Sequence, residues 1–214
     1  MTSVTSQVPH ILNEVSSYYA RKISEYGPIP QGVDWNGEES QHLRFQQLLR
    51  GVDASRLFSL NDLGCGYGAL VDYLGQSGFD CTYHGYDIAA PMVTVAKKTH
   101  AGNARAAFSV GSVPTNPADY AVASGIFNVR QQRPDAEWLN FILETIGTLN
   151  SSSIRGFSFN CLTSYSDEDK KRGYLYYADP CFLFNHCIRR FGRSVSLLHD
   201  YDLYEFTIIV SKNP

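Results

Sequence analysis

The chain has 214 residues, of which 43% are hydrophobic and 18% are charged, and its formal net charge is −3. This length and composition predict a globular protein with a sizeable core and exclude a disordered chain. Nucleic-acid binding usually requires a basic patch or stripe, so the negative charge balance does not favour a nucleic-acid partner.

Two helices are expected before the first strand. Residues 1–10 are polar and are expected to be frayed, whereas apolar and aromatic residues recur with helical spacing over 11–23. A loop rich in glycine and proline follows, and a second helix is expected over 38–49. Tyr18 and Tyr19 are adjacent, so a helix cannot turn both of them to the same face. One of the two can pack while the other points into a site.

The rest of the chain, residues 55–214, alternates strands with helices, which predicts a parallel sheet preceded by an N-terminal helical segment, residues 1–54. Strands are expected over 57–63, 81–87, 106–110, 119–124, 154–160, 195–199 and 203–211. Helices are expected over 68–77, 91–101, 135–149 and 178–191. Only residues 200–202 separate the last two strands, and so short a link permits an antiparallel pair but not a parallel crossover.

The stretch after the first strand carries the strongest functional signal. Asp62 ends an apolar strand, Gly64, Gly66 and Gly68 follow at alternate positions, and helical spacing resumes at Ala69. Glycine lets a ligand approach the backbone closely, and the following helix presents free N–H groups to it. Taken alone, three such glycines can also form no more than a tight turn.

A second acidic residue sharpens this interpretation. Asp87 ends the next strand, 23 residues after Gly64, close to the spacing at which a second-strand acid binds a ribose diol. The glycine pattern is G-x-G-x-G rather than G-x-G-x-x-G, which favours a ligand without a pyrophosphate.

With these residues in place, the sequence resembles the class I S-adenosylmethionine-dependent methyltransferases. The resemblance is carried by Asp62-Leu63-Gly64-Cys65-Gly66-Tyr67-Gly68 and by Asp87, and it covers about residues 55–130. It implies an α/β fold, a Rossmann-like three-layer sandwich whose mostly parallel seven-stranded sheet has an antiparallel last strand. It also implies S-adenosyl-L-methionine as the cofactor, and it makes residues 1–54 a helical cover of the cofactor and substrate site.

The same resemblance assigns cofactor contacts. Asp62, Gly64 and Gly66 would border the methionine part, Asp87 would hold the ribose hydroxyls and Ile88 would pack on the adenine. The remaining candidates for cofactor contact are Cys65, Gly111, Ser112, Ser124 and Arg44. Family members often have an acid where this chain has Ser112, so the adenine contact would come from a hydroxyl or a carbonyl. Arg44 would meet the cofactor carboxylate, or would instead pair with a surface acid.

Candidates for substrate binding and catalysis come from the cover and from the ends of later strands. The substrate-binding candidates are Tyr18, Trp35, Asn128 and Tyr177. Trp35 can equally be a surface anchor, Asn128 a turn residue, and each tyrosine a cap on the sheet edge. His199 is the candidate general base because histidine titrates near neutral pH, although a strand-end histidine with a local hydrogen bond is the alternative.

The cysteine spacing and the length of the apolar runs indicate whether a metal site or a membrane span is expected, and in which cellular compartment the protein is found. The five cysteines are an odd number without C-x-x-C spacing, so no metal site is expected, and reduced cysteines predict a cytoplasmic protein. Residues 1–10 lack the features of a signal peptide, and no run approaches ~18 apolar residues, so no membrane span is expected.

The sequence therefore predicts a methyltransferase that acts on the oxygen or nitrogen of a small molecule. An RNA or protein methyltransferase of the same fold is the alternative. A nicotinamide-dependent oxidoreductase and a non-catalytic cofactor-binding subunit also remain open.

Overall fold

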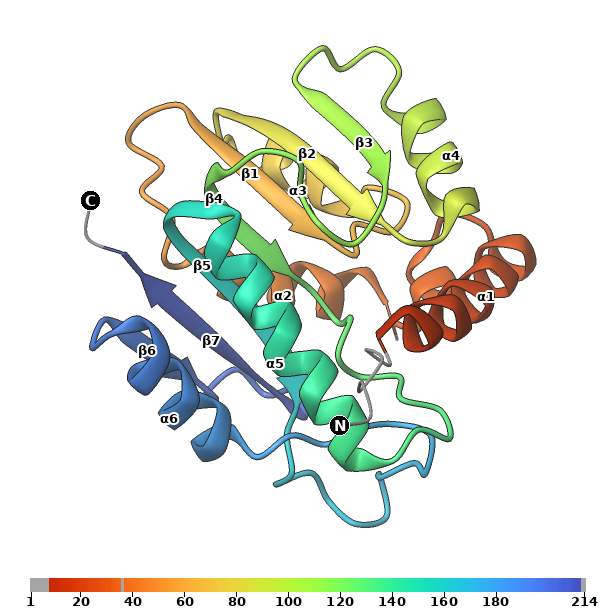
Figure 1. The fold of residues 1–214 in the computed structure, drawn as a ribbon. Coiled ribbons are helices and arrows are strands. Elements are labelled where there is room, and N and C mark those ends of the chain that lie inside the picture. The colour runs from red at the N-terminus through yellow and green to blue at the C-terminus, as the bar shows by residue number, and fades with distance from the viewer. Residues whose placement is uncertain (1–7, 36, 213–214) are drawn as a thin grey trace, which may run out of the picture.

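The centre of the molecule is a seven-stranded sheet with strand order β3-β2-β1-β4-β5-β7-β6 (Figure 1). The computed structural model describes residues 8–35 and 37–212. The strands are β1 (Phe58–Leu63), β2 (Cys81–Asp87), β3 (Ala106–Val110), β4 (Ala118–Ala123), β5 (Ser153–Leu162), β6 (Val195–Leu198) and β7 (Glu205–Ser211). Strands β1 to β5 are parallel, and β7 lies antiparallel between β5 and β6. The predicted mostly parallel sheet with an antiparallel last strand is confirmed.

Helices cover both faces of the sheet. They are α1 (Val8–Tyr26), the 3-10 helix η1 (Pro30–Val33), α2 (Glu38–Leu49), α3 (Ala69–Gln76), α4 (Ala90–Thr99), α5 (Asp135–Ser151) and α6 (Pro180–Phe191). In Figure 1, α5 and α6 lie in front of the sheet and α2 and α3 lie behind it, which gives the predicted three layers. Helix α1 lies apart from these layers, beside α4 and near the carboxyl ends of β1, β2 and β3.

The alternation of side chains along β4 divides the core in two. Tyr120 and Val122 pack in the apolar cluster formed with α2, α3 and α4, whereas Ala121 and Ala123 pack in the cluster formed with α5 and α6. This alternation follows from the two-residue period of a strand, and both faces of β4 are buried because helices lie on both sides. The sheet is therefore a rigid platform, and its carboxyl edge holds the segments that follow each strand.

The connection between β3 and β4 contains no helix. Residues 111–117 include Pro114 and Pro117, which cannot donate the backbone hydrogen bonds that a helix requires. In Figure 1 this connection runs across the front of the sheet, and no helix lies in front of β2 and β3. On that face the ring of His84 hydrogen-bonds the Ser109 hydroxyl at 2.9 Å and the Tyr86 hydroxyl at 3.0 Å.

Several predicted boundaries differ from the structure by a few residues. Gly68 is the residue before α3 rather than part of it, because its φ of 91° lies in the left-handed region. Strand β7 begins at Glu205 instead of residue 203, since Asp202 (φ 52°) bends the preceding turn. Helix α1 already begins at Val8, so the predicted fraying is wrong for residues 8–10, while residues 1–7 lie outside the described residues.

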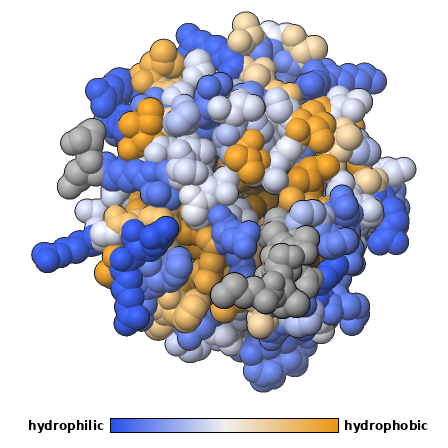
Figure 2. All heavy atoms as spheres, viewed as in Figure 1, coloured by the Kyte–Doolittle hydropathy of each residue, from blue (hydrophilic) through white to orange (hydrophobic). Residues whose placement is uncertain are grey.

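The visible surface is a mixture of hydrophilic and hydrophobic residues. Figure 2 shows apolar patches separated by polar side chains on this face. Within the described part of the chain, no helix is long and apolar enough to cross a bilayer.

Candidate functional site

The turn after β1 has the conformation that its glycines predict. Gly64 has φ 76°, and a β-carbon added there would lie 2.0 Å from a methyl carbon of Ile126, so no larger residue fits. The N–H groups of Gly64 and Cys65 donate to the carbonyl of Tyr86 at 2.7 and 3.1 Å. The turn is thus fastened to the end of β2, and Gly64, Cys65 and Gly66 line the pocket described below.

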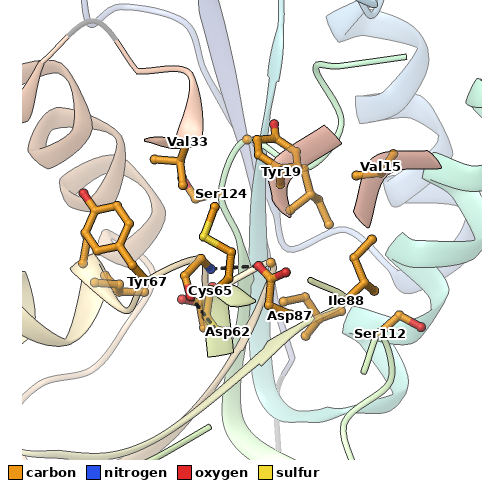
Figure 3. A pocket seen from close by; sticks show the side chains of 18 of the residues that line it. Val15, Tyr19, Val33, Asp62, Cys65, Tyr67, Asp87, Ile88, Ser112 and Ser124 are labelled. Carbon is orange, nitrogen blue, oxygen red and sulfur yellow. Dashed lines mark hydrogen bonds between the residues drawn. The ribbon is translucent and has the colours of Figure 1, made fainter. Parts of the chain in front are cut away.

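Asp87 ends β2 and fixes the other side of this turn. One carboxylate oxygen accepts the Gly66 N–H at 2.9 Å, and the other accepts the Ala89 N–H at 2.8 Å. The first of these hydrogen bonds is drawn in Figure 3. Burial raises the pKa of Asp87, while the two backbone donors act in the opposite direction. Each oxygen keeps a further lone pair for a ligand hydroxyl.

Asp62 lies at the bottom of the site with an unused oxygen. Tyr83 donates its hydroxyl to Oδ2 at 2.6 Å, whereas Oδ1 is buried without a hydrogen-bond partner among the described residues. The buried hydroxyl of Ser124, which follows the neighbouring strand β4, is also without a partner there. Burial raises the pKa of Asp62 to about 7. Buried polar atoms are normally satisfied, so these two atoms are exceptions to the usual pattern.

These residues line one pocket that is partly open to solvent. Its walls come from the ends of β1 to β4 and the turns after them, from η1 and the segment between η1 and α2, and from one face of each of the helices α1 to α5. Figure 3 shows Tyr19 and Val15 of α1 facing Asp87 and Ile88 across it. The pocket is lined by Leu12, Val15, Tyr19, Val33, Trp35, Gln41, Phe45, Asp62, Leu63, Gly64, Cys65, Gly66, Tyr67, Ala69, Leu70, Asp87, Ile88, Met92, Gly111, Ser112, Ser124, Gly125, Ile126, Phe141 and Thr145.

The ionisable side chains among the described residues of this lining are all acidic. Asp62 and Asp87 are its only ionisable carboxylates, and no lysine, arginine or histidine is among the described residues that line it. Most of the remaining wall is apolar or aromatic. Such a pocket favours a ligand with hydroxyl or cationic groups over one with phosphates.

The structure brings most of the predicted site residues together. Nine of the ten cofactor candidates line the pocket, and so does the substrate candidate Trp35. The nine are Asp62, Gly64, Cys65, Gly66, Asp87, Ile88, Gly111, Ser112 and Ser124. Their contacts with a ligand remain predictions.

Arg44 does not line the pocket, and the structure gives it another partner. It is buried, and its guanidinium binds the carboxylate of Glu205 with N–O distances of 2.7–2.9 Å. The same guanidinium lies 3.9 Å from the centre of the Trp35 ring. Arg44 therefore holds a residue of the pocket wall instead of meeting a ligand carboxylate, and its partner Glu205 is buried, so the alternative pairing with a surface acid is also wrong.

Tyr18 is the predicted substrate-binding residue, but it is the adjacent Tyr19 that lines the pocket. Tyr18 donates its hydroxyl to Asp34 at 2.6 Å outside the pocket, while Tyr19 lines the pocket. Successive helical residues point about 100° apart, so only one of the pair can face inward. Burial raises the pKa of Tyr19 well above its usual value, which keeps its hydroxyl neutral.

Three further candidates lie outside the pocket. The side-chain oxygen of Asn128 accepts the N–H of Leu162 at 3.1 Å, and the Tyr177 hydroxyl accepts the N–H of Arg172 at 2.9 Å. Both are local structural bonds. His199 is exposed, and its ring centre lies 6.0 Å from that of Tyr165. The structure therefore does not support His199 as the catalytic base.

Sequence reasoning missed the parts of the pocket that helices supply. Gln41 and Phe45 are four residues apart on α2, and Phe141 and Thr145 are four apart on α5, so each pair shares one helix face. This spacing is also typical of ordinary core packing, and nothing in the sequence distinguishes the two. No group of three or more His, Cys, Asp or Glu side chains that could hold a metal ion occurs in residues 8–35 and 37–212.

Comparison with known proteins agrees with this geometry. Residues 61–150 match the family model described as "Methyltransferase domain". A protein of Mycobacterium tuberculosis (strain ATCC 25618 / H37Rv), named "Putative methyltransferase Rv1506c", is 56% identical over 164 residues. That match covers 77% of this chain and 99% of the mycobacterial protein.

Solved structures share the fold at low sequence identity. Magnesium protoporphyrin IX methyltransferase from Synechocystis PCC 6803, with bound S-adenosylhomocysteine, superposes with a TM-score of 0.64 at 14% identity. The match covers 94% of this chain and 99% of that one. An O-methyltransferase from neocarzinostatin biosynthesis, in complex with S-adenosylmethionine and 2-hydroxy-5-methyl naphthoic acid, has a TM-score of 0.55 at 12% identity. This second match covers 93% of this chain and 69% of that one.

The glycine turn, the second-strand acid and the sheet order are those of one family, and the close mycobacterial relative is named for the same activity. The chain belongs to the class I S-adenosylmethionine-dependent methyltransferases, with S-adenosyl-L-methionine as its cofactor.

Proposed function

We propose that this methyltransferase acts on an oxygen or nitrogen atom of a small molecule. The observation that carries the proposal is the pocket itself, which is concave and walled mainly by apolar and aromatic side chains, with a few polar groups at its base. Small-molecule sites are typically concave and mostly apolar pockets with a few polar groups. Two structural neighbours are named for small molecules, a magnesium porphyrin in one case and a naphthoic acid in the other.

The residues of the pocket fit the cofactor. Asp62 Oδ1 and the Ser124 hydroxyl, both buried and unpartnered, would accept hydrogen bonds from its ammonium group. Asp87 would accept hydrogen bonds from the ribose hydroxyls, and Ile88 and Ser112 would border the adenine. Bound in this way, the cofactor supplies a methyl group that its sulfonium has already activated toward an attacking nucleophile.

The chain's own contribution is alignment and exclusion of water rather than strong base catalysis. No histidine, lysine or arginine lines the pocket in the described part of the chain, and the Cys65 thiol and Tyr19 hydroxyl have raised pKa values because they are buried. Fixing two reactants in line removes much of the entropic barrier to displacement. We therefore expect an acceptor that is nucleophilic without deprotonation by a histidine.

Methyl transfer from radiolabelled S-adenosylmethionine tests the acceptor class. The enzyme is incubated with the ultrafiltrate of a cell extract and, separately, with its protein and RNA fractions, and Asp87→Ala serves as the inactive control. Label that enters the ultrafiltrate only with the wild-type enzyme supports the proposal. Enzyme-dependent label in the RNA or protein fraction, with none in the ultrafiltrate, would contradict it.

A further inference from the structure

Trp35 forms the wall between the pocket and the C-terminal third of the chain. It lines the pocket, whereas no described residue beyond Thr145 does so. A β-carbon added to Gly125 would lie 2.4 and 2.6 Å from two atoms of the indole, so the ring edge rests directly on the Gly125 backbone at the end of β4. The ring centre lies 3.9 Å from the Arg44 guanidinium carbon. The indole is thus held between a stacked cation and a glycine.

Arg44 and Gly125 are both connected by hydrogen bonds to the carboxylate of Glu205, at the start of β7, Arg44 directly and Gly125 through Asn160. Its Oε1 accepts hydrogen bonds from Nε and Nη2 of Arg44 at 2.9 and 2.7 Å. Its Oε2 accepts one from Nδ2 of Asn160 at 2.9 Å, and Oδ1 of Asn160 in turn accepts the Gly125 N–H at 2.7 Å. One carboxylate therefore orients the guanidinium on one side of Trp35 and the backbone on the other.

The side chains of Glu205, Asn160 and Arg44 form a buried network. Glu205 is 1% exposed, Asn160 is 0% exposed and Arg44 is 7% exposed. A buried ion pair contributes little net stability but is costly to break, because one partner is then left as an uncompensated charge. The planar guanidinium can bind a carboxylate with two nitrogens and stack on an indole at once, which a lysine cannot do.

We propose that Glu205 is a positioning residue for the cofactor pocket. Although it does not line the pocket, it fixes Trp35 against Gly125 through Arg44 and Asn160, and so sets the wall next to the glycine turn. The N-terminal segment that carries Trp35 and Arg44 is docked on the sheet by the same contact. This role concerns the cofactor pocket and is independent of which acceptor the enzyme methylates.

The test compares three variants of the full chain for affinity and stability. Glu205→Gln keeps the shape of the side chain and removes its charge, while Arg44→Lys keeps the charge and removes the stacked fork. Asp119→Asn is the matched control: Asp119 accepts two hydrogen bonds from Ser59 at 2.8 Å near the amino end of β4, away from the pocket. The Kd of S-adenosylhomocysteine is measured by calorimetry and stability by thermal unfolding. Subtracting the spectrum of Trp35→Phe from that of the wild type isolates the Trp35 emission.

We expect Glu205→Gln and Arg44→Lys to raise the Kd of S-adenosylhomocysteine about tenfold or more and to shift the Trp35 emission to the red. Asp119→Asn should lower the melting temperature while its Kd stays within about twofold of wild type. The proposal is overturned if both network variants bind with wild-type Kd, or if Asp119→Asn loses as much affinity for the same loss of stability. Should Glu205→Gln fail to fold, Arg44→Lys decides alone, because it retains the ion pair.

Discussion

At the scale of single residues, the unusual group is the carboxyl of Asp62. Burial raises its pKa from 3.8 to about 7, so the folded protein holds a proton that the unfolded chain releases. The folded state therefore gains stability from this group below its unfolded pKa and loses it as the pH rises toward about 7. The loss is at most about 1.4 kcal/mol per pH unit for one proton.

We predict that Asp62→Asn reduces the pH dependence of the unfolding free energy in the cofactor-free protein. An amide does not titrate, so the difference in unfolding free energy between mutant and wild type should change in the mutant's favour from about pH 5 to about pH 7. Urea unfolding at several pH values measures it. Parallel pH profiles for the two proteins would show that Asp62 does not carry the raised pKa.

Asp87 gives the second prediction at this scale. Its carboxylate binds two backbone N–H groups of the site and is expected to accept the ribose hydroxyls. Hydrogen bonds to charged groups contribute ~1.5–3 kcal/mol each, so Asp87→Ala should weaken binding of S-adenosylhomocysteine about 100-fold. Titration calorimetry measures the change. A Kd within a few-fold of wild type would remove Asp87 from the cofactor site.

At the scale of elements, α1 is the first element of the chain that lines the pocket. Its inner face carries Leu12, Val15 and Tyr19, spaced three and four residues apart, so one stripe of the helix closes the pocket. Tyr18 lies on a different face and bonds Asp34. The two adjacent tyrosines are therefore a matched pair for testing which face matters.

We expect Tyr19→Ala to weaken the binding of S-adenosylhomocysteine about tenfold, because it opens the wall of the pocket. Tyr18→Ala removes a partly exposed hydrogen bond and should leave the Kd within about twofold of wild type. Calorimetric titrations of both variants, with melting temperatures as a check on folding, decide between them. Equal losses would mean that α1 contributes to stability and not to the wall.

Elements that depend on local sequence could be predicted, whereas contacts between distant segments could not. The strand, glycine turn and helix around Gly64 are local in the chain, and local patterns of apolar and glycine residues predict them directly. The partner predicted for Arg44 is wrong because its actual partner, the carboxylate of Glu205, lies 161 positions away in the sequence. No local pattern predicts a pairing over that distance. His199 was expected to end a strand, but β6 ends at Leu198 and the following turn leaves the ring exposed.

At the scale of the whole molecule, one ligand joins segments that are far apart in the chain. The pocket is lined by the helices α1 to α5, by η1 and the segment before α2, and by the turns after four strands. A cofactor bound there contacts most of these only in the folded state, so it should stabilise the entire fold by mass action. Its charge preference should follow that of the lining, which has two carboxylates and no cationic side chain among the described residues.

We predict that S-adenosylhomocysteine raises the melting temperature and that NADH does not. At a ligand concentration of about 100 times Kd the gain is ~2.7 kcal/mol, which for a chain of this size corresponds to roughly 5–10 °C. At about pH 8, above the pKa of about 7 that burial gives Asp62, the pyrophosphate of NADH would face two carboxylates without a cation to offset its charge, so its shift should be close to zero. Thermal unfolding monitored by circular dichroism measures both ligands, with Asp87→Ala as the control that should lose the first shift. A comparable shift with NADH would mean that the glycine turn accommodates a pyrophosphate despite this charge, and would contradict the electrostatic account of the pocket.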